Sequence, residues 1–126
     1  LTLLAMTVGA DYFKAGVANA PVTAWRLYDA IYTERFMMKP DENPEGYRSA
    51  SVFTHIDKLK GKLLLIHGMC DDNVHVQNTM QLAERLQIMG KPFQMMVYPS
   101  QPHSFSCQQR KYHQAVTTIE FILGSL

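Results

Sequence analysis

The strongest hydrophobic signal in the chain is the unbroken apolar run Leu63–Ile66, which is followed by His67 and Gly68. A strand with one solvated face alternates apolar and polar residues, whereas a strand buried on both faces, as in a parallel sheet covered by helices, is apolar throughout. The run therefore predicts a central strand over Lys62–His67. Polar residues that follow it would lie at the carboxyl edge of the sheet, where α/β proteins place their working groups.

Shorter apolar segments on both sides of this strand predict further strands and helices. Pro21 should stop one strand-like segment, and Gly90 follows an amphipathic segment as glycine commonly follows a helix. The order of strands and helices predicts an α/β fold with a parallel sheet flanked by helices. The expected elements are strands at Phe13–Ala20 and Phe93–Tyr98, an apolar helix tail at Leu1–Val8, a short helix at Pro44–Ala50, a connector at Ser51–Lys60, and helices at Val76–Met89 and Gln108–Leu123, the last with Ala115, Ile119 and Ile122 on one face.

Aromatic residues recur at helical spacing between Thr23 and Met38. Trp25, Tyr28, Tyr32 and Phe36 lie three or four residues apart, so a single helix would place them along one side. One interpretation is a stripe that packs into the core. The other is the wall of a binding pocket, with two phenol hydroxyls available to a substrate.

Composition and charge exclude several classes of protein. The 126 residues are 47% hydrophobic and 18% charged, which is typical of a globular domain, and the net charge of +1 gives no electrostatic reason to bind nucleic acid or a membrane surface. No apolar run is long enough to span a bilayer. Cys70 and Cys107 lack metal-site spacing and the chain has no HExxH motif, so we expect neither a metal nor a cofactor.

Two loops carry residues that could act together in catalysis. Asp71 and Asp72 follow the central strand, and His103 follows the next strand along the chain. Neighbouring parallel strands lie about 4.8 Å apart, so a carboxylate and a histidine in these loops could pair, and a carboxylate is what a histidine base needs on its far nitrogen. The alternative is that an aspartate caps the following helix and His103 is an ordinary loop residue. His67 is expected to be a hydrogen-bonded structural histidine.

The nucleophile of such a site is absent from the sequence. An acid and a histidine after successive strands follow the order of the last two members of a Ser-Asp-His triad in α/β hydrolases, but the chain has no G-x-S-x-G motif. The chain also opens on Leu1, as if within a helix. We therefore expect a piece of a longer protein, with the serine located before residue 1.

Two stretches of sequence resemble a known family of peptidases. YDAIYTERFM begins at Tyr28, HGMCDDNVH begins at His67, and Ala20-Pro21-Val22, Trp25 and His103 complete the match. Along its whole length the chain resembles the catalytic domain of the prolyl oligopeptidase family, and most of all the dipeptidyl-peptidase IV branch. The resemblance implies the C-terminal portion of an α/β-hydrolase fold, with residues 1–126 as a partial peptidase domain that lacks the nucleophile elbow and an upstream β-propeller.

The resemblance also implies roles for individual residues and an activity. Asp71 would be the triad carboxylate, His103 the general base and acid, and Asn73 a donor to a carbonyl of the substrate backbone. The parent protein would be a serine exopeptidase that releases Xaa-Pro or Xaa-Ala dipeptides from peptide N-termini, and the fragment alone would be inactive. The pocket that accepts proline or alanine would be walled by Val22, Trp25, Tyr28, Tyr32 and Val74.

Some features depart from the family or leave alternatives open. Ser104 follows His103 where the family usually has glycine, which would narrow the approach to the imidazole. Alternative functions are an acylaminoacyl-peptidase, an oligopeptidase or an esterase of the same fold, or a non-catalytic interaction module. Peptides with penultimate proline or alanine are the expected partners. Export to a periplasm or cell surface is an expectation from the resemblance alone. The sheet edge near Val17 should be open and support self-association.

Overall fold

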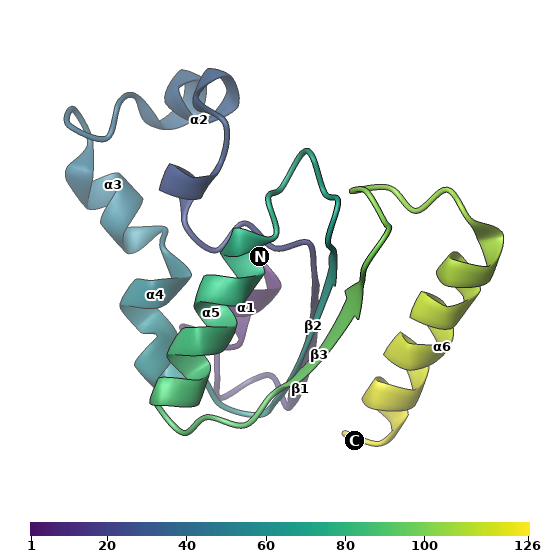
Figure 1. Cartoon of the computed structure of the whole chain (residues 1–126). Coiled ribbons are helices and arrows are strands. Elements are labelled where there is room, and N and C mark those ends of the chain that lie inside the picture. The colour runs from purple at the N-terminus through teal and green to yellow at the C-terminus, as the bar shows by residue number, and fades with distance from the viewer.

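The computed structural model describes residues 1–126, and its centre is a three-stranded parallel sheet in the order β1-β2-β3 (Figure 1). The strands are β1 (Ala15–Asn19), β2 (Lys62–Gly68) and β3 (Gln94–Tyr98). The register pairs Val17 with Leu64 and Ile66 with Met96. All three strands end at the same edge, which confirms the predicted parallel α/β architecture and gathers the loops after β1, β2 and β3 on one side.

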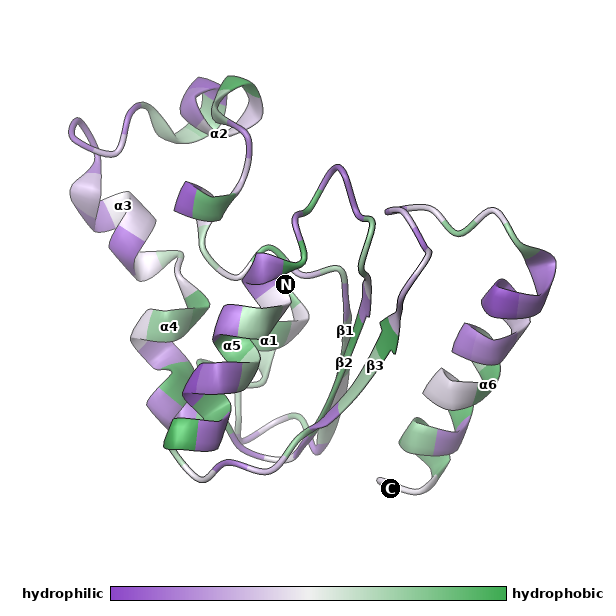
Figure 2. Cartoon of the chain, in the orientation of Figure 1, coloured by the Kyte–Doolittle hydropathy of each residue, from purple (hydrophilic) through white to green (hydrophobic).

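The central strand is apolar throughout because helices cover both of its faces. Leu63 and Leu65 pack in a cluster with residues of α4 (Val52–His55) and α5 (Gln77–Ile88). Leu64 and Ile66 pack in a second cluster with Phe121 of α6 (Gln108–Leu123). Figure 1 shows α1 (Thr2–Ala5), α4 and α5 on one face of the sheet and α6 on the other. Figure 2 shows predominantly hydrophobic strands and a hydrophilic loop beyond β2.

Outside residues 23–38, the helices lie close to their predicted positions. Gly90 adopts φ +64° directly after α5, a conformation that favours glycine, and this explains the end of that helix. The connector expected over residues 51–60 is largely helical. The helical elements are α1 (Thr2–Ala5), η1 (Trp25–Leu27), α2 (Ala30–Met37), α3 (Pro44–Ser49), α4 (Val52–His55), η2 (Ile56–Lys58), α5 (Gln77–Ile88) and α6 (Gln108–Leu123), η denoting a short 3-10 helix.

The inward face of α6 differs from the predicted one. Phe121 is 7% exposed and packs against the sheet, whereas Ile119 and Ile122 are 55% and 39% exposed, and Ala115 is also exposed. On a helix Phe121 and Ile119 point in roughly opposite directions, so only one of them can face the sheet. The larger ring buries more apolar area, which favours the observed rotation of the helix.

The single helix predicted over Thr23–Met38 is also wrong. The segment forms η1, breaks at Tyr28 and Asp29, and resumes as α2. The Asp29 carboxylate accepts a hydrogen bond from the Tyr32 N–H at 2.8 Å and so acts as the N-cap of α2. The break leaves Tyr28 extended between the two helices. Every helix of the chain falls short of the length and apolar character needed to cross a bilayer.

Candidate active site

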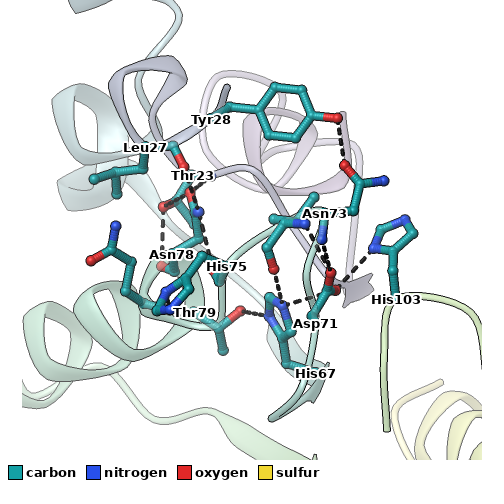
Figure 3. A network of polar contacts seen from close by, with 12 residues as sticks. Thr23, Leu27, Tyr28, His67, Asp71, Asn73, His75, Asn78, Thr79 and His103 are labelled. Atoms are coloured by element: carbon teal, nitrogen blue, oxygen red, sulfur yellow. Dashed lines mark hydrogen bonds and ion pairs between the residues drawn. The ribbon is translucent and has the colours of Figure 1, made fainter. Parts of the chain in front are cut away.

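Asp71 and His103 lie in contact at the carboxyl edge of the sheet. Asp71 sits in the loop after β2 and His103 in the loop after β3, and the His103 Nδ1 atom is 2.9 Å from Asp71 Oδ2 (Figure 3). The Asp71 side chain is 0% exposed, whereas that of His103 is 37% exposed. The adjacent parallel strands thus bring together two residues that lie far apart in the sequence, as predicted.

The second carboxylate oxygen of Asp71 organises its own loop. Asp71 Oδ1 accepts the N–H groups of Asn73 and Val74 at 3.0 and 2.8 Å. This closes a turn of the kind that aspartate side chains commonly make with backbone two or three residues on. The sequence left two alternatives for the aspartate, pairing with histidine and capping of the following helix. Asp71 pairs with His103, and α5 begins only at Gln77 without a side-chain cap, so the capping alternative is wrong. Asp72 is exposed.

These contacts determine the charge of Asp71. Burial by itself would raise the pKa of this carboxyl group, but hydrogen bonds from His103, Val74 and Asn73, together with the charge of His103, outweigh burial and lower the pKa. Asp71 is therefore ionised at neutral pH and can only accept hydrogen bonds. His103 Nδ1 must then be the donor, so that in the neutral imidazole Nε2 is the free base. Nε2 makes no hydrogen bond and can receive a proton.

His67 is buried beside this pair, with both ring nitrogens in use. Nε2 lies 2.8 Å from the Val74 carbonyl oxygen and Nδ1 lies 2.7 Å from Thr79 Oγ1. A carbonyl only accepts, so Nε2 carries the proton and Nδ1 accepts from the Thr79 hydroxyl. Nε2 also lies 3.3 Å from Asp71 Oδ2. With 0% exposure and no free nitrogen, His67 is a structural residue beneath the acid, as its position after the apolar run indicated.

The aromatic residues of the segment that follows β1 form a cluster above the Asp71 loop. The ring centroids of Trp25, Tyr28 and Tyr32 lie between 5.5 and 6.0 Å apart, and Phe36 continues the row at 5.0 Å from Tyr32. Tyr32 and Phe36 are 48% and 66% exposed, so the core-stripe interpretation is wrong for this cluster. The Tyr28 hydroxyl donates to Asn73 Oδ1 at 2.7 Å, which joins the cluster to the Asp71 loop (Figure 3).

The remaining predicted pocket residues lie at different depths. Val22 and Trp25 line a mostly apolar hollow of about 330 Å³, and Trp25 and Tyr28 line a second hollow of about 90 Å³. Val74 is 5% exposed, and its backbone, rather than a surface side chain, contacts Asp71 and His67. Ser104, which departs from the family pattern, is exposed.

A buried polar pair, Thr23 and Asn78, was not predicted from the sequence. The two residues are 1% and 0% exposed and bond to each other across 55 positions of sequence. One signal was present: Asn78 lies four residues before Leu82 and eight before Leu86, so a polar residue occupies the apolar stripe of a helix. In the described structure no three His, Cys, Asp or Glu side chains are arranged to hold a metal ion.

Comparison with known proteins gives a consistent set of similarities. The sequence model of the Prolyl oligopeptidase family matches residues 1–126. The chain is 36% identical over 129 residues to human dipeptidyl peptidase 8, covering 100% of the chain and 14% of that protein. It is 44% identical over 109 residues to dipeptidyl aminopeptidase A of Saccharomyces cerevisiae, covering 83% of the chain and 11% of that protein.

A solved structure has nearly the same fold as the chain. The crystal structure of Porphyromonas gingivalis dipeptidyl peptidase 4 superimposes with a TM-score of 0.96 at 42% identity, covering 99% of the chain and 18% of that protein. The chain thus spans less than a fifth of the length of each of these relatives.

Proposed function

Because the chain belongs to the prolyl oligopeptidase family, we propose that it supplies the acid and the histidine of a serine peptidase active site in a longer protein. That protein would release Xaa-Pro or Xaa-Ala dipeptides from peptide N-termini. The observation that carries the proposal is the 2.9 Å hydrogen bond between ionised Asp71 and the partly exposed His103. The relatives named as dipeptidyl peptidases support the release of dipeptides.

The proposed reaction is acyl transfer with His103 as proton carrier. A serine hydroxyl attacks the scissile carbonyl carbon while its proton passes to His103 Nε2, and Asp71 stabilises the imidazolium that forms. The C–N bond then breaks as His103 gives this proton to the leaving amine. Water then attacks the carbonyl carbon of the resulting ester and loses a proton to His103. The bond between this carbon and the serine oxygen breaks as His103 returns the proton to that oxygen, and the dipeptide leaves.

The aromatic cluster would bind the residue next to the scissile bond. Proline suits a slot formed by Trp25, Tyr28 and Tyr32, since its rigid apolar ring fills the slot with little side-chain entropy to lose. Val22 would extend the wall, whereas Val74, which is 5% exposed, would support the Asp71 loop through its backbone. Asn73, whose Oδ1 is occupied by the Tyr28 hydroxyl, would use its amide N–H to donate to a carbonyl oxygen of the substrate.

The serine, the oxyanion hole and the β-propeller would come from sequence outside these 126 residues. Two findings support this proposal: the chain lacks a G-x-S-x-G motif, and it spans 14% of the human relative. The isolated chain would then bind and orient the substrate, but it could not form the acyl-enzyme because it lacks the serine. Hydrolysis of a Gly-Pro anilide by the isolated chain would contradict this expectation.

The activity is tested in the longer protein with a matched pair of substrates. Gly-Pro-p-nitroanilide should be cleaved, and its N-acetylated form should not, since an exopeptidase that releases dipeptides requires a free amino terminus. His103→Ala should abolish cleavage of the first. Preference for the acetylated substrate would indicate an acylaminoacyl-peptidase or oligopeptidase instead, and cleavage of neither would favour a non-catalytic module.

The open edge of β1 would make the isolated chain self-associate. β1 pairs with β2 on one side only, and beside it lies a mostly apolar hollow of about 400 Å³ lined by Phe13, Val17 and residues of α1. Unpaired backbone groups next to apolar surface favour pairing with another chain. Light scattering of the isolated chain should show oligomers that grow with concentration, and a monomer at high concentration would refute the proposal.

A further inference from the structure

We infer that Asn78 is a positioning residue for substrate specificity, which fastens the aromatic wall of the site to the helix that follows the Asp71 turn. This inference rests on the proposed peptidase function for its substrate, although its structural part can be measured separately. Asn78 lies in the first turn of α5 and is 0% exposed. It would not touch the substrate and would act through Trp25 and Tyr28.

Every polar atom of the Asn78 side chain is used. Oδ1 accepts the Thr23 N–H at 3.0 Å and lies 3.1 Å from the Thr23 hydroxyl, which is also 3.0 Å from the Asn78 carbonyl oxygen. Nδ2 donates to the carbonyl oxygens of Leu27 and His75, at 3.3 and 3.2 Å. Thr23 lies two residues before η1 and Leu27 ends it, so the amide holds the chain on both sides of Trp25. Figure 3 shows Thr23 and Leu27 beside Asn78.

Few other hydrogen bonds attach this segment to the rest of the chain. Apart from the bonds to Asn78, the long-range hydrogen bonds of residues 21–28 are the one from the Val52 N–H to the Thr23 carbonyl and the one from the Tyr28 hydroxyl to Asn73. The latter lies on the exposed side of the site. The buried Thr23–Asn78 pair is therefore the main polar attachment of the wall, and a buried hydrogen bond is costly to leave half-made.

The same turn of α5 also supports the acid. Thr79 follows Asn78 and bonds to His67, whose Nε2 lies 3.3 Å from Asp71 Oδ2. Asn78 therefore contacts the segment that carries the aromatic wall, and Thr79 contacts His67 beside the acid. Because both residues belong to one rigid helical turn, that turn sets the distance between the wall and the acid. A substrate must match this distance when its scissile bond lies at the serine.

The test uses the longer protein with Asn78→Ala, the near-isosteric Asn78→Asp and the control Gln77→Ala. Gln77 is an exposed neighbour in the same turn. Asn78→Asp retains the acceptors for Thr23 but cannot donate to Leu27, so it keeps the experiment informative if Asn78→Ala does not fold. The control should match wild type to within about twofold in every measurement.

The first measurement separates substrate binding from triad chemistry. Both Asn78 variants should raise KM for Gly-Pro-p-nitroanilide about tenfold, the equivalent of one lost hydrogen bond to a buried group. The rate of serine labelling by a small fluorophosphonate, which does not need the dipeptide pocket, should stay near that of wild type. An unchanged KM would overturn the inference. A labelling rate reduced as much as kcat/KM would also overturn it, because such a loss indicates damage to the whole active site.

The second measurement is independent of activity. Hydrogen exchange in residues 21–28 should accelerate about tenfold in Asn78→Ala, while exchange in β2 should not change. Unchanged exchange in residues 21–28 would overturn the anchoring role even in an active enzyme. A wild-type protein that fails to cleave the substrate would instead overturn the proposed function and the specificity role, with the anchoring role then decided by exchange alone.

Discussion

The substitution Gly68→Ala should disrupt the pair of Asp71 and His103, although Gly68 itself is not part of the pair. Gly68 is the last residue of β2, and a Cβ there would lie 2.3 Å from the carbonyl oxygen of Gln101 and 3.0 Å from that of Pro102. His103 is the next residue of this loop. Separation of the two backbones would also stretch the hydrogen bond that the Cys70 N–H donates to the Gln101 carbonyl oxygen at 3.0 Å.

The size of the effect follows from these distances. Ordinary contact between a methyl carbon and a carbonyl oxygen begins near 3.4 Å, so the His103 loop must retreat by about 1 Å. The 2.9 Å bond between His103 and Asp71 would then exceed the usual range for an N–H···O hydrogen bond. A misplacement of about 1 Å at a catalytic group can cost about 100-fold in rate, or about 2.7 kcal/mol of transition-state stabilisation.

The assay is kcat/KM of Gly68→Ala on the dipeptide anilide, in the longer protein, corrected for the folded fraction by circular dichroism. Gly90→Ala is the matched control, because Gly90 has φ +64° but nothing within 4 Å of a Cβ. That substitution should cost about 1–2 kcal/mol of stability through backbone strain and leave kcat/KM unchanged. Gly68→Ala that is folded and as active as wild type would refute the steric argument.

Three further outcomes are expected for the longer protein. Tyr28→Phe removes the 2.7 Å bond to Asn73 and should raise KM about two- to tenfold with little change in labelling of the serine; an unchanged KM would contradict the role of this hydroxyl. Because the pKa of Asp71 is lower in the folded than in the unfolded chain, its stabilising contribution is present above the ordinary carboxyl pKa of about 4 and lost as the pH falls through the folded value. As the pH is lowered below ~4, the urea midpoint of wild type should therefore fall more steeply than that of Asp71→Asn. Parallel curves of midpoint against pH for the two proteins would exclude this linkage. Leu65→Ala, at a side chain that is 0% exposed, should cost about 2–5 kcal/mol in urea unfolding, against less than about 0.5 kcal/mol for the exposed Met80→Ala.

The central strand and the candidate pair were predictable because both depend on local patterns with a strong physical cause. An apolar run without alternation requires cover on both faces, and Leu63–Ile66 has it. Parallel strands end at one edge, so the positions of Asp71 and His103 directly after two such strands were enough to bring them together.

Helix faces were less predictable when two apolar sets competed. In α6 the spacing of Ala115, Ile119 and Ile122 was as regular as any, but the sheet buries Phe121 and leaves these residues exposed. Periodicity identifies a helix because hydrogen bonding within it is local. Its rotation depends on the surface it packs against, which residues distant in sequence create.

In the aromatic segment, too, the local spacing was predictable and the packing was not. Spacing correctly grouped Trp25, Tyr28, Tyr32 and Phe36, yet the helix breaks at Asp29, whose carboxylate caps α2. The spacing left a core stripe and a pocket wall as alternatives, and the exposure of Tyr32 and Phe36 in the folded chain, with the contact between Tyr28 and Asn73, favours the wall.

The buried pair of Thr23 and Asn78 lay beyond the reach of pattern analysis. A polar residue on an apolar stripe shows that a partner is needed, because an unpaired buried amide is costly. It does not show which partner, since a hydrogen bond across 55 positions depends on how the chain returns to the same place. Chemistry carried by single residues could thus be inferred from sequence, whereas the spacing of the wall and the acid required the folded chain.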